Sequence, residues 1–478
     1  MSYVRHMPRL YYQHPGTWFG DCMPIFADGA FQLFHQRDTR NPGPFGEPFG
    51  WALARTTDFV SYQDLGEALQ RGADDAQDQF IFAGSVFEAA TAKPTATQGA
   101  DGRFHAFYTG FNRDFAKIGK PAQVLMHAVS DDLVHWETLD GELVAPEPGY
   151  DPHNWRDPYV LRDDDDDRWI MILGARKDGD QIVSGRTVWY TSTDLESWHF
   201  EGDFWAPDLY SMHEMPDLFR IGDHWYLLTT EYSDRSKTVY RSSTSLAGPW
   251  SAPVDDAFDG RAYYAARSAS DGDHRYLFGW VATKEDEDDL GKVQWGGTLV
   301  VHEVFQRDDH SLGVRPPQSV LDAFGPAQEL ITDSQTVAAP DGRRTQLLGN
   351  TESSTFLLRL TLRPEQNRSF AIRLFGDEQT GDGYAFTFRT GEQRVDFDRV
   401  PNFPWYRYDN RGSERPFTVN PGQTYEIAII VDETIATLYV DGVALNVRRY
   451  AEPGKAIGVD IVDGEVEILS STLAELPG

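Results

Sequence analysis

A short strand, a tight polar turn and an aromatic-rich strand recur in order along the first two thirds of the chain. The copies are "PIFADGAFQLFHQ", "ATQGADGRFHAFYTG", "YVLRDDDDDRWIMILGA", "DLFRIGDHWYLLTTE" and "ARSASDGDHRYLFGW". Asp-Gly or other polar residues between β-favouring residues predict a hairpin in each copy. The turns fall near Asp28, Asp101, Asp165, Gly222 and Asp271, a period of roughly 50 to 75 residues that is typical of propellers. The sequence therefore predicts five propeller blades.

A second motif follows the same period. "TTDFVSY", "SDDLVHW", "TSTDLESW" and "SSTSLAGPW" each come after one hairpin. We expect them in the outer part of a blade.

The pattern changes after about residue 320, where the polar stretch "ELITDSQTVAAPDGRRTQ" reads as a connection. Segments such as "STFLLRLTLRP", "RSFAIRLFG" and "YEIAIIVDETIATLYVDGVAL" then alternate apolar and polar residues between turns, which predicts a β-sandwich. We expect an all-β chain, with a five-bladed β-propeller at 1–325 followed by a C-terminal β-sandwich at 326–478. Packing against the propeller is the simplest role for the sandwich, and sugar binding by it stays open.

Charge and composition limit the classes of ligand that the chain is expected to bind. Lys and Arg total 43 against 75 Asp and Glu, a net charge of −32, which disfavours nucleic acid and anionic membranes and suits a small neutral oligosaccharide. The single cysteine, Cys22, excludes an intramolecular disulfide. No apolar run has the length of a signal-peptide core or a membrane span, so we expect a cytoplasmic protein. A homo-oligomer stays open.

Three acids precede the first, third and fourth hairpins at similar distances from their turns. They are Asp21 in "WFGDCMP", Asp157 in "NWRDPYV" and Glu214 in "MHEMPDLF". Because the first strand of each blade lines the central channel, these carboxylates are expected in one channel at nearly the same height. The same register in the other two blades holds Ser85 and Tyr264.

Carboxylates that face a neutral polyol indicate glycoside chemistry, in which one attacks and another, with a raised pKa, protonates the leaving oxygen. Arg156 beside Asp157 is expected to keep that acid ionised. His213-Glu214 starts like a zinc-binding helix, but Pro216 follows where the helix must continue. The acidic run 163–167 is expected to be a solvated hairpin tip rather than a calcium site. We expect no metal and no cofactor.

These residues resemble glycoside hydrolase family 32, the β-fructofuranosidases, invertases and exo-fructanases. "WRDP" at Asp157 is similar to the family's Arg-Asp-Pro motif, and "HEMPDLF" to its Glu-Cys-Pro-Asp-Leu-Phe motif, with Met215 in place of Cys. "FAGSVF", "FQLFHQ", "GWALARTTDFVSY", "YYAARS" and "QWGGTLVVHEV" resemble further family segments along nearly the whole chain.

The resemblance implies a five-bladed propeller followed by a sandwich. It also implies that Asp21 is the nucleophile, Glu214 the acid/base and Asp157 the transition-state stabiliser that holds fructosyl hydroxyls. The substrate-binding residues that it implies are Trp18, Gln36, Trp51, Phe82, Ser85, Arg156, Tyr264 and Trp295.

The opening motif departs from the family, which has Trp-Met-Asn-Asp-Pro-Asn-Gly. Gly20 replaces an Asn that contacts sugar, Cys22 replaces a Pro, and Ala262 stands where an acid usually precedes the Phe-Tyr-Ala segment. We expect the cleaved bond to be kept and the recognised leaving group to differ.

The leading hypothesis is a retaining exo-acting hydrolase that releases terminal β-D-fructofuranosyl units from short fructosides, with Asp21 and Glu214 about 5 to 5.5 Å apart. A fructosyltransferase, including an anhydride-forming one, would use the same covalent intermediate. A furanosidase acting on an arabinofuranoside and a non-catalytic sugar-binding propeller are the remaining alternatives.

Overall fold

The computed structural model describes residues 7–89, 103–139, 144–233, 235–404, 407 and 412–478. Within them the chain is almost entirely β-strand, with one short helix, α1 (Gln318–Asp322), and three single 3-10 turns at Phe115–Ile118, Glu285–Glu287 and Thr390–Glu392. The turn predicted near Asp101 lies outside these residues. No helix in the described ranges is both long and apolar enough to cross a membrane.

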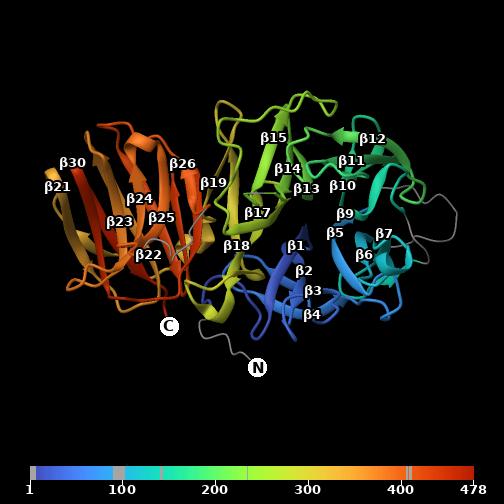
Figure 1. Ribbon diagram of the computed structural model, residues 1–478, viewed down its shortest axis with the longest axis horizontal. Coiled ribbons are helices and arrows are strands. Elements are labelled where there is room, and N and C mark those ends of the chain that lie inside the picture. The colour runs from blue at the N-terminus through green and yellow to red at the C-terminus, as the bar shows by residue number, and fades with distance from the viewer. Residues whose placement is uncertain (1–6, 90–102, 140–143, 234, 405–406, 408–411) are drawn as a thin grey trace.

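The first part of the chain forms consecutive antiparallel groups of strands, arranged as the blades of a propeller (Figure 1). The first is β1 (Trp18–Ala27), β2 (Ala30–Asp38), β3 (Trp51–Thr56) and β4 (Gln63–Leu69). The second is β5 (Phe80–Glu88), β6 (Phe104–Phe111), β7 (Gln123–Ser130) and β8 (Glu137–Thr138). The third is β9 (Tyr150–Asp163), β10 (Arg168–Lys177), β11 (Gly185–Ser192) and β12 (His199–Trp205). The fourth is β13 (His213–Ile221), β14 (His224–Glu231) and β15 (Thr238–Ser243), and the fifth is β16 (Tyr263–Ser270), β17 (Arg275–Lys284), β18 (Val293–Gln306) and β19 (Leu312–Arg315).

Four of the predicted hairpins are present, because the first two strands of the first, third, fourth and fifth groups pair with each other. In the second group β6 pairs with β5, and the first half of the predicted copy lies outside the described residues. The ring closes where the last group meets the first. Phe19 of β1 pairs with Gly297 of β18, and Tyr12 forms a bridge with Leu299 of the same strand. Closure by strand pairing leaves no open sheet edge between the first and last blades.

In the first three blades the second repeated motif makes the turn between the two outer strands. The hydroxyls of Thr56, Ser130 and Ser192 each accept the backbone N–H three residues later, at 2.9 Å in all three turns. Such local hydrogen bonds favour a turn over a continued strand. The motif recurs with the blade period because each of these blades needs the same turn.

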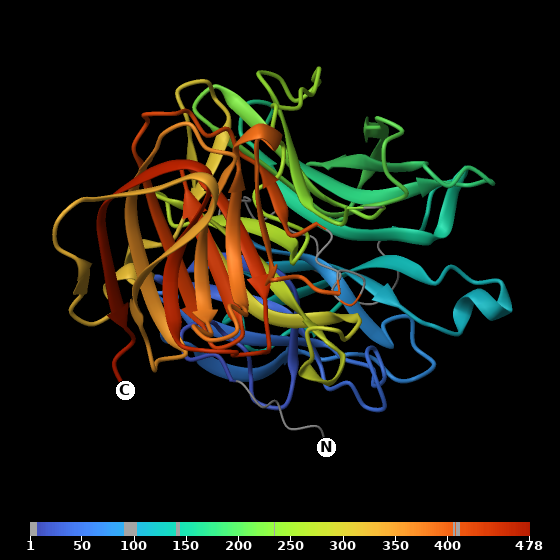
Figure 2. The ribbon, with the colours of Figure 1, turned by 60° about the vertical axis from the view of Figure 1, so that its left-hand side comes forward.

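The C-terminal part folds as the predicted sandwich, drawn in orange and red in Figure 2. Its strands are β20 (Gln328–Ile331), β21 (Gln335–Asn350), β22 (Thr355–Pro364), β23 (Ser369–Gly376), β24 (Gly383–Arg389), β25 (Arg394–Val400), β26 (Glu414–Pro416), β27 (Tyr425–Asp432), β28 (Ile435–Val440), β29 (Val443–Arg448) and β30 (Ala456–Glu475). The long β30 pairs with β23 along its first part and with β22 along its last, so it joins the two layers. The boundary predicted at 325/326 falls between β19 and β20 and stays a prediction.

The sandwich packs on the propeller through buried apolar and polar contacts. Tyr439 and Ile435 of β28 belong to the same buried apolar cluster as the propeller residue Tyr263. Within this interface the Asp259 carboxylate accepts hydrogen bonds from His302 Nε2 at 3.0 Å and from Asn446 Nδ2 at 2.6 Å. The two parts therefore share one continuous core.

Candidate active site

The innermost strand of each blade is interrupted by a β-bulge where it lines the channel. Two residues of β1, β9, β13 and β16 stand against one residue of the neighbouring strand, and β5 has a single extra residue at Ala83. A bulge bends its strand and redirects the side chains beside it. The repeat therefore supplies five sites at which a side chain can be turned into the channel.

The three acids occupy three successive positions across this bulge. Glu214 is the last paired residue before it, Asp157 is its first residue with a φ of +64°, and Asp21 is its second residue. We expected the three acids at nearly the same height in the channel. They instead occupy different positions relative to the bulge, and their side chains line the same cavity.

That cavity has a volume of about 850 Å³. It brings together most of the residues that the sequence singled out, namely Asp21, Gln36, Phe82, Arg156, Asp157, Glu214, Tyr264 and Trp295. Such a volume is in the upper part of the range of roughly 300 to 1,000 Å³ that holds drug-sized ligands.

Three predicted substrate-binding residues do not line this cavity. The Trp51 indole is completely buried between blades and donates to the Phe82 carbonyl at 3.1 Å. Trp18 is covered by the guanidinium of Arg40, 4.1 Å above its ring. Ser85 lies beyond the bulge of β5, and its hydroxyl accepts the N–H of Val160 at 3.0 Å. Packing and strand alternation direct these side chains elsewhere.

Two hydrogen-bond donors hold Glu214. Arg156 Nη2 donates to Oε1 at 2.7 Å, and the Tyr264 hydroxyl donates to Oε2. Arg156 is farther from Asp157, with 3.9 Å between Nε and Oδ2. The charge of Arg156 acts on Asp157 in the expected direction, against the rise in pKa that burial causes, but the closer contact of the guanidinium is with Glu214.

Asp21 lies in a different environment. Trp280 Nε1 donates to its Oδ1 at 3.0 Å, and the Gln36 amide reaches Oδ2 at 3.3 Å when its nitrogen faces this acid. Burial, followed by the negative charges of Asp157 and Glu214, raises the pKa of Asp21 to about 8, against the opposing effect of the Trp280 hydrogen bond. This environment therefore favours a proton on Asp21.

Asp157 is fixed mainly through the backbone. Its Oδ2 accepts the Met215 N–H at 3.0 Å, and its carbonyl accepts from Arg267 at 2.8 Å. Its own N–H donates to Thr109 at 2.9 Å. Burial raises the pKa of Asp157, although the nearby positive charge of Arg156 opposes this shift.

Sequence reasoning missed Trp280 and Arg267. Trp280 ends the fifth hairpin copy as Gln36 ends the first, so its place in the repeat was an available signal. Arg267 is almost completely buried and donates to carbonyls of two other blades, at Gly84 and Asp157. No local pattern marks such a contact.

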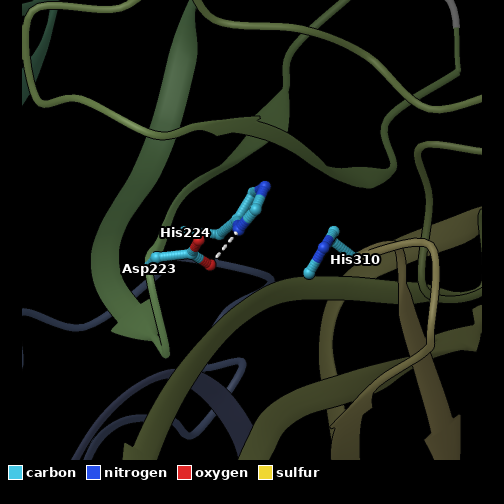
Figure 3. Close-up of side chains that lie close together, drawn as sticks. All are labelled: Asp223, His224 and His310. Carbon is cyan, nitrogen blue, oxygen red and sulfur yellow. Dashed lines mark hydrogen bonds and ion pairs between the residues drawn. The ribbon is translucent and has the colours of Figure 1, made fainter.

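One group of metal-ligand side chains occurs in the described ranges, Asp223, His224 and His310 (Figure 3). Asp223 pairs with His224 Nδ1 at 2.7 Å, and the two histidine rings are stacked at 4.0 Å with planes 14° apart. An imidazole binds a metal in the plane of its ring, so stacked rings do not share one ion without turning. Along β13, Glu214 and Ile221 are roughly 23 Å apart, at about 3.3 Å per residue. Asp223 and His224 follow Ile221 in the sequence, so they lie at the end of the blade away from Glu214. The carboxylate cavity is thus a separate site.

Comparisons with known proteins agree on one family. The N-terminal domain of glycosyl hydrolases family 32 matches residues 12–316. Sucrose-6-phosphate hydrolase of Escherichia coli is 23% identical over 93% of this chain and 90% of its own length. Levanbiose-producing levanase of Bacillus subtilis is 28% identical over 52% of this chain and 44% of its own.

Solved structures share the fold over the whole length. Exo-inulinase from Aspergillus awamori has a TM-score of 0.76 at 16% identity, covering 100% of both chains. Fructan 1-exohydrolase IIa from Cichorium intybus has a TM-score of 0.77 at 15% identity, covering 100% of this chain and 98% of its own. Since the family match spans more than half of the sequence, the chain belongs to glycosyl hydrolase family 32 and is a glycosidase.

Proposed function

We propose that the chain is a retaining, exo-acting hydrolase that releases terminal β-D-fructofuranosyl units from short neutral fructosides such as sucrose or fructo-oligosaccharides. The observation that carries this proposal is that carboxylates from three blades line one cavity, each with its own donors. The relatives named as a sucrose-6-phosphate hydrolase and a levanase support a fructosyl unit as the transferred group.

In the first step the Asp21 carboxylate attacks the anomeric carbon of the fructosyl unit, while Glu214 gives a proton to the departing glycosidic oxygen. In the second step Glu214 takes a proton from water, which displaces Asp21. Arg156 and Tyr264 hold the Glu214 carboxyl group in place for both transfers. Asp157, held by backbone contacts, accepts hydrogen bonds from fructosyl hydroxyls.

This chemistry needs an ionised Asp21 and a protonated Glu214. Because burial and the neighbouring charges raise the pKa of Asp21 to about 8, Asp21 must lose a proton over much of the neutral range before it can attack.

Glu214→Gln tests the assignment. We expect it to lower fructose release from sucrose by about 10²- to 10⁴-fold, the usual contribution of a general acid/base. Glu329→Gln, which alters an exposed glutamate on β20, is the matched control. NMR of the first product formed should show the β anomer, and the inverted anomer would contradict the double displacement.

The same assay separates the alternatives. Larger saccharides or a cyclic difructose at high substrate concentration would favour a fructosyltransferase. Cleavage of an aryl arabinofuranoside, with every fructoside inert, would favour another furanosidase. Full activity in Glu214→Gln would contradict the catalytic assignment.

A further inference from the structure

The cavity does not end at the carboxylates. It continues along the loop between β17 and β18, from Asp289 to Val293, and reaches the sandwich at Phe397, Ser413 and Val447. In Figure 1 β17 and β18 lie between the other blades and the sandwich. A fructosyl unit at the three acids would fill only the inner end of this space.

The tip of the loop is fastened to the sandwich. Asp289 accepts the backbone N–H of Tyr450 at 2.9 Å and the hydroxyl of Tyr384. Its Oδ2 is also 3.4 Å from Arg399 Nη1. Three sandwich residues therefore hold one loop carboxylate, which fixes the loop against the second domain.

The base of the loop is fastened as well. Arg40 donates to Gln294 Oε1 at 2.9 Å and to the Trp295 carbonyl at 2.8 Å. Arg448 of the sandwich donates to the Ala282 carbonyl at 2.7 Å. Because both ends are held, the loop forms a rigid wall of the cavity.

This wall carries apolar side chains that are open to solvent. Leu290 is 52% exposed and Val293 is 68% exposed, and Tyr232 from the fourth blade, 55% exposed, also lines the cavity. Exposed apolar side chains that are held in place around a cavity mark a ligand surface. Sugar rings offer apolar faces to such side chains, as they do to aromatic rings.

Trp295 occupies the space beside the first acid. A Cβ at Gly20 would lie 2.2 Å from Trp295 Cη2, so the indole in this position leaves no room for a side chain at position 20. The Trp295 ring therefore provides an aromatic surface of the cavity beside Gly20. Trp295, Val293 and Leu290 are close together in the sequence, and all three line the cavity.

We propose that this wall, made of the loop 289–295 and the facing sandwich residues, binds the second and third sugar units of a fructo-oligosaccharide on its leaving-group side. The inference rests on the proposed function and narrows its substrate class. The chain is then a hydrolase of trisaccharides and longer fructosides, for which sucrose is a poor substrate because it is too short to reach the wall.

The test compares kcat/KM for sucrose, kestose and nystose. The parent is expected to cleave the trisaccharide kestose at least about tenfold more efficiently than sucrose, the scale of one or two apolar contacts. The double variant Leu290→Ser, Val293→Ser should reduce this ratio to nearly one. Both side chains are exposed, so its thermal unfolding should match that of the parent.

Val254→Ser is the matched control, because Val254 is a fully exposed valine that does not line the cavity. It should leave the ratio unchanged. Equal kcat/KM for sucrose and kestose in the parent, or an unchanged ratio in the double variant, would overturn the inference while leaving the fructosidase proposal intact.

Two further results would also overturn it. Sucrose 6-phosphate cleaved faster than kestose would mean that the basic side chains lining the cavity, such as Arg261 and Lys292, bind a charged substrate instead. Release of fructose from no fructoside would refute the proposed function, and the inference with it.

Discussion

Replacing Trp280 with phenylalanine is expected to move the acid limb of the pH profile of kcat/KM to higher pH. Trp280 Nε1 donates to Asp21 Oδ1 at 3.0 Å, and phenylalanine keeps an aromatic ring without that donor. A hydrogen bond to a charged group contributes about 1.5 to 3 kcal/mol. One pKa unit corresponds to about 1.4 kcal/mol, so the pKa of Asp21 should rise by about one to two units.

The direction follows from the proton that Asp21 must lose. The indole N–H stabilises the ionised carboxylate, so its removal raises the pKa above the value of about 8 that burial and the charges of Asp157 and Glu214 produce. Below that pH the reactive, ionised fraction falls by about 10- to 100-fold relative to the parent. Well above it the two enzymes should converge.

The assay is the initial-rate kcat/KM for one fructoside between about pH 5 and pH 10, since kcat/KM reports the free enzyme. Trp136→Phe is the control, because it loses an indole hydrogen bond of 3.0 Å to the Leu133 carbonyl outside the cavity. An acid limb that stays in place while the rate drops at every pH would show that Trp280 acts through packing alone. A shift to lower pH would refute the reasoning on Asp21.

Further variants test the neighbouring contacts. Tyr264→Phe removes the hydroxyl that donates to Glu214, so kcat/KM for a sugar leaving group should fall by about 10- to 100-fold. An aryl fructoside, whose leaving group needs little protonation, should be affected less, and an equal loss for both would contradict a role through Glu214. Arg267→Met leaves the carbonyls of Gly84 and Asp157 without this donor, so the free energy of unfolding in denaturant should drop by about 2 to 6 kcal/mol, and an unchanged value would contradict the contact. Burial alone would raise the pKa of Asp259, but the hydrogen bond and charge of His302 outweigh it and lower that pKa. The stability that Asp259 contributes is therefore complete above about pH 4 and is lost as pH falls through the lowered pKa, so thermal unfolding of Asp259→Asn should depend less on pH in that window than the parent does.

The strands and their repetition could be predicted from local residue chemistry. Turn chemistry at Asp28, Gly222 and Asp271 and the alternation beside it are local, so they predict hairpins wherever the rest of the chain lies. The motifs around Asp157 and Glu214 likewise place both acids on innermost strands, and the structure puts them at the bulges of β9 and β13.

The directions and contacts of the side chains depend on tertiary packing. The stagger of the three acids depends on bulges, which are set by the register with the neighbouring strand. The sequence analysis placed Trp51 and Ser85 in the substrate cavity, but both make contacts within the propeller instead. The same residue types occur in blade cores and in cavities, so residue type alone does not separate the two.

The proton states and the shape of the cavity also depend on distant partners. Asp21 and its donor Trp280 are 259 residues apart, and Asp289 meets Tyr450 across 161 residues. Burial and charge at a site are sums over groups that only folding brings together, so a pKa of about 8 at Asp21 has no local sequence signature. The amino-acid sequence is therefore sufficient to predict the propeller, the sandwich and the identity of the acids. The raised pKa of Asp21 and the cavity wall shared with the sandwich arise only when the chain folds.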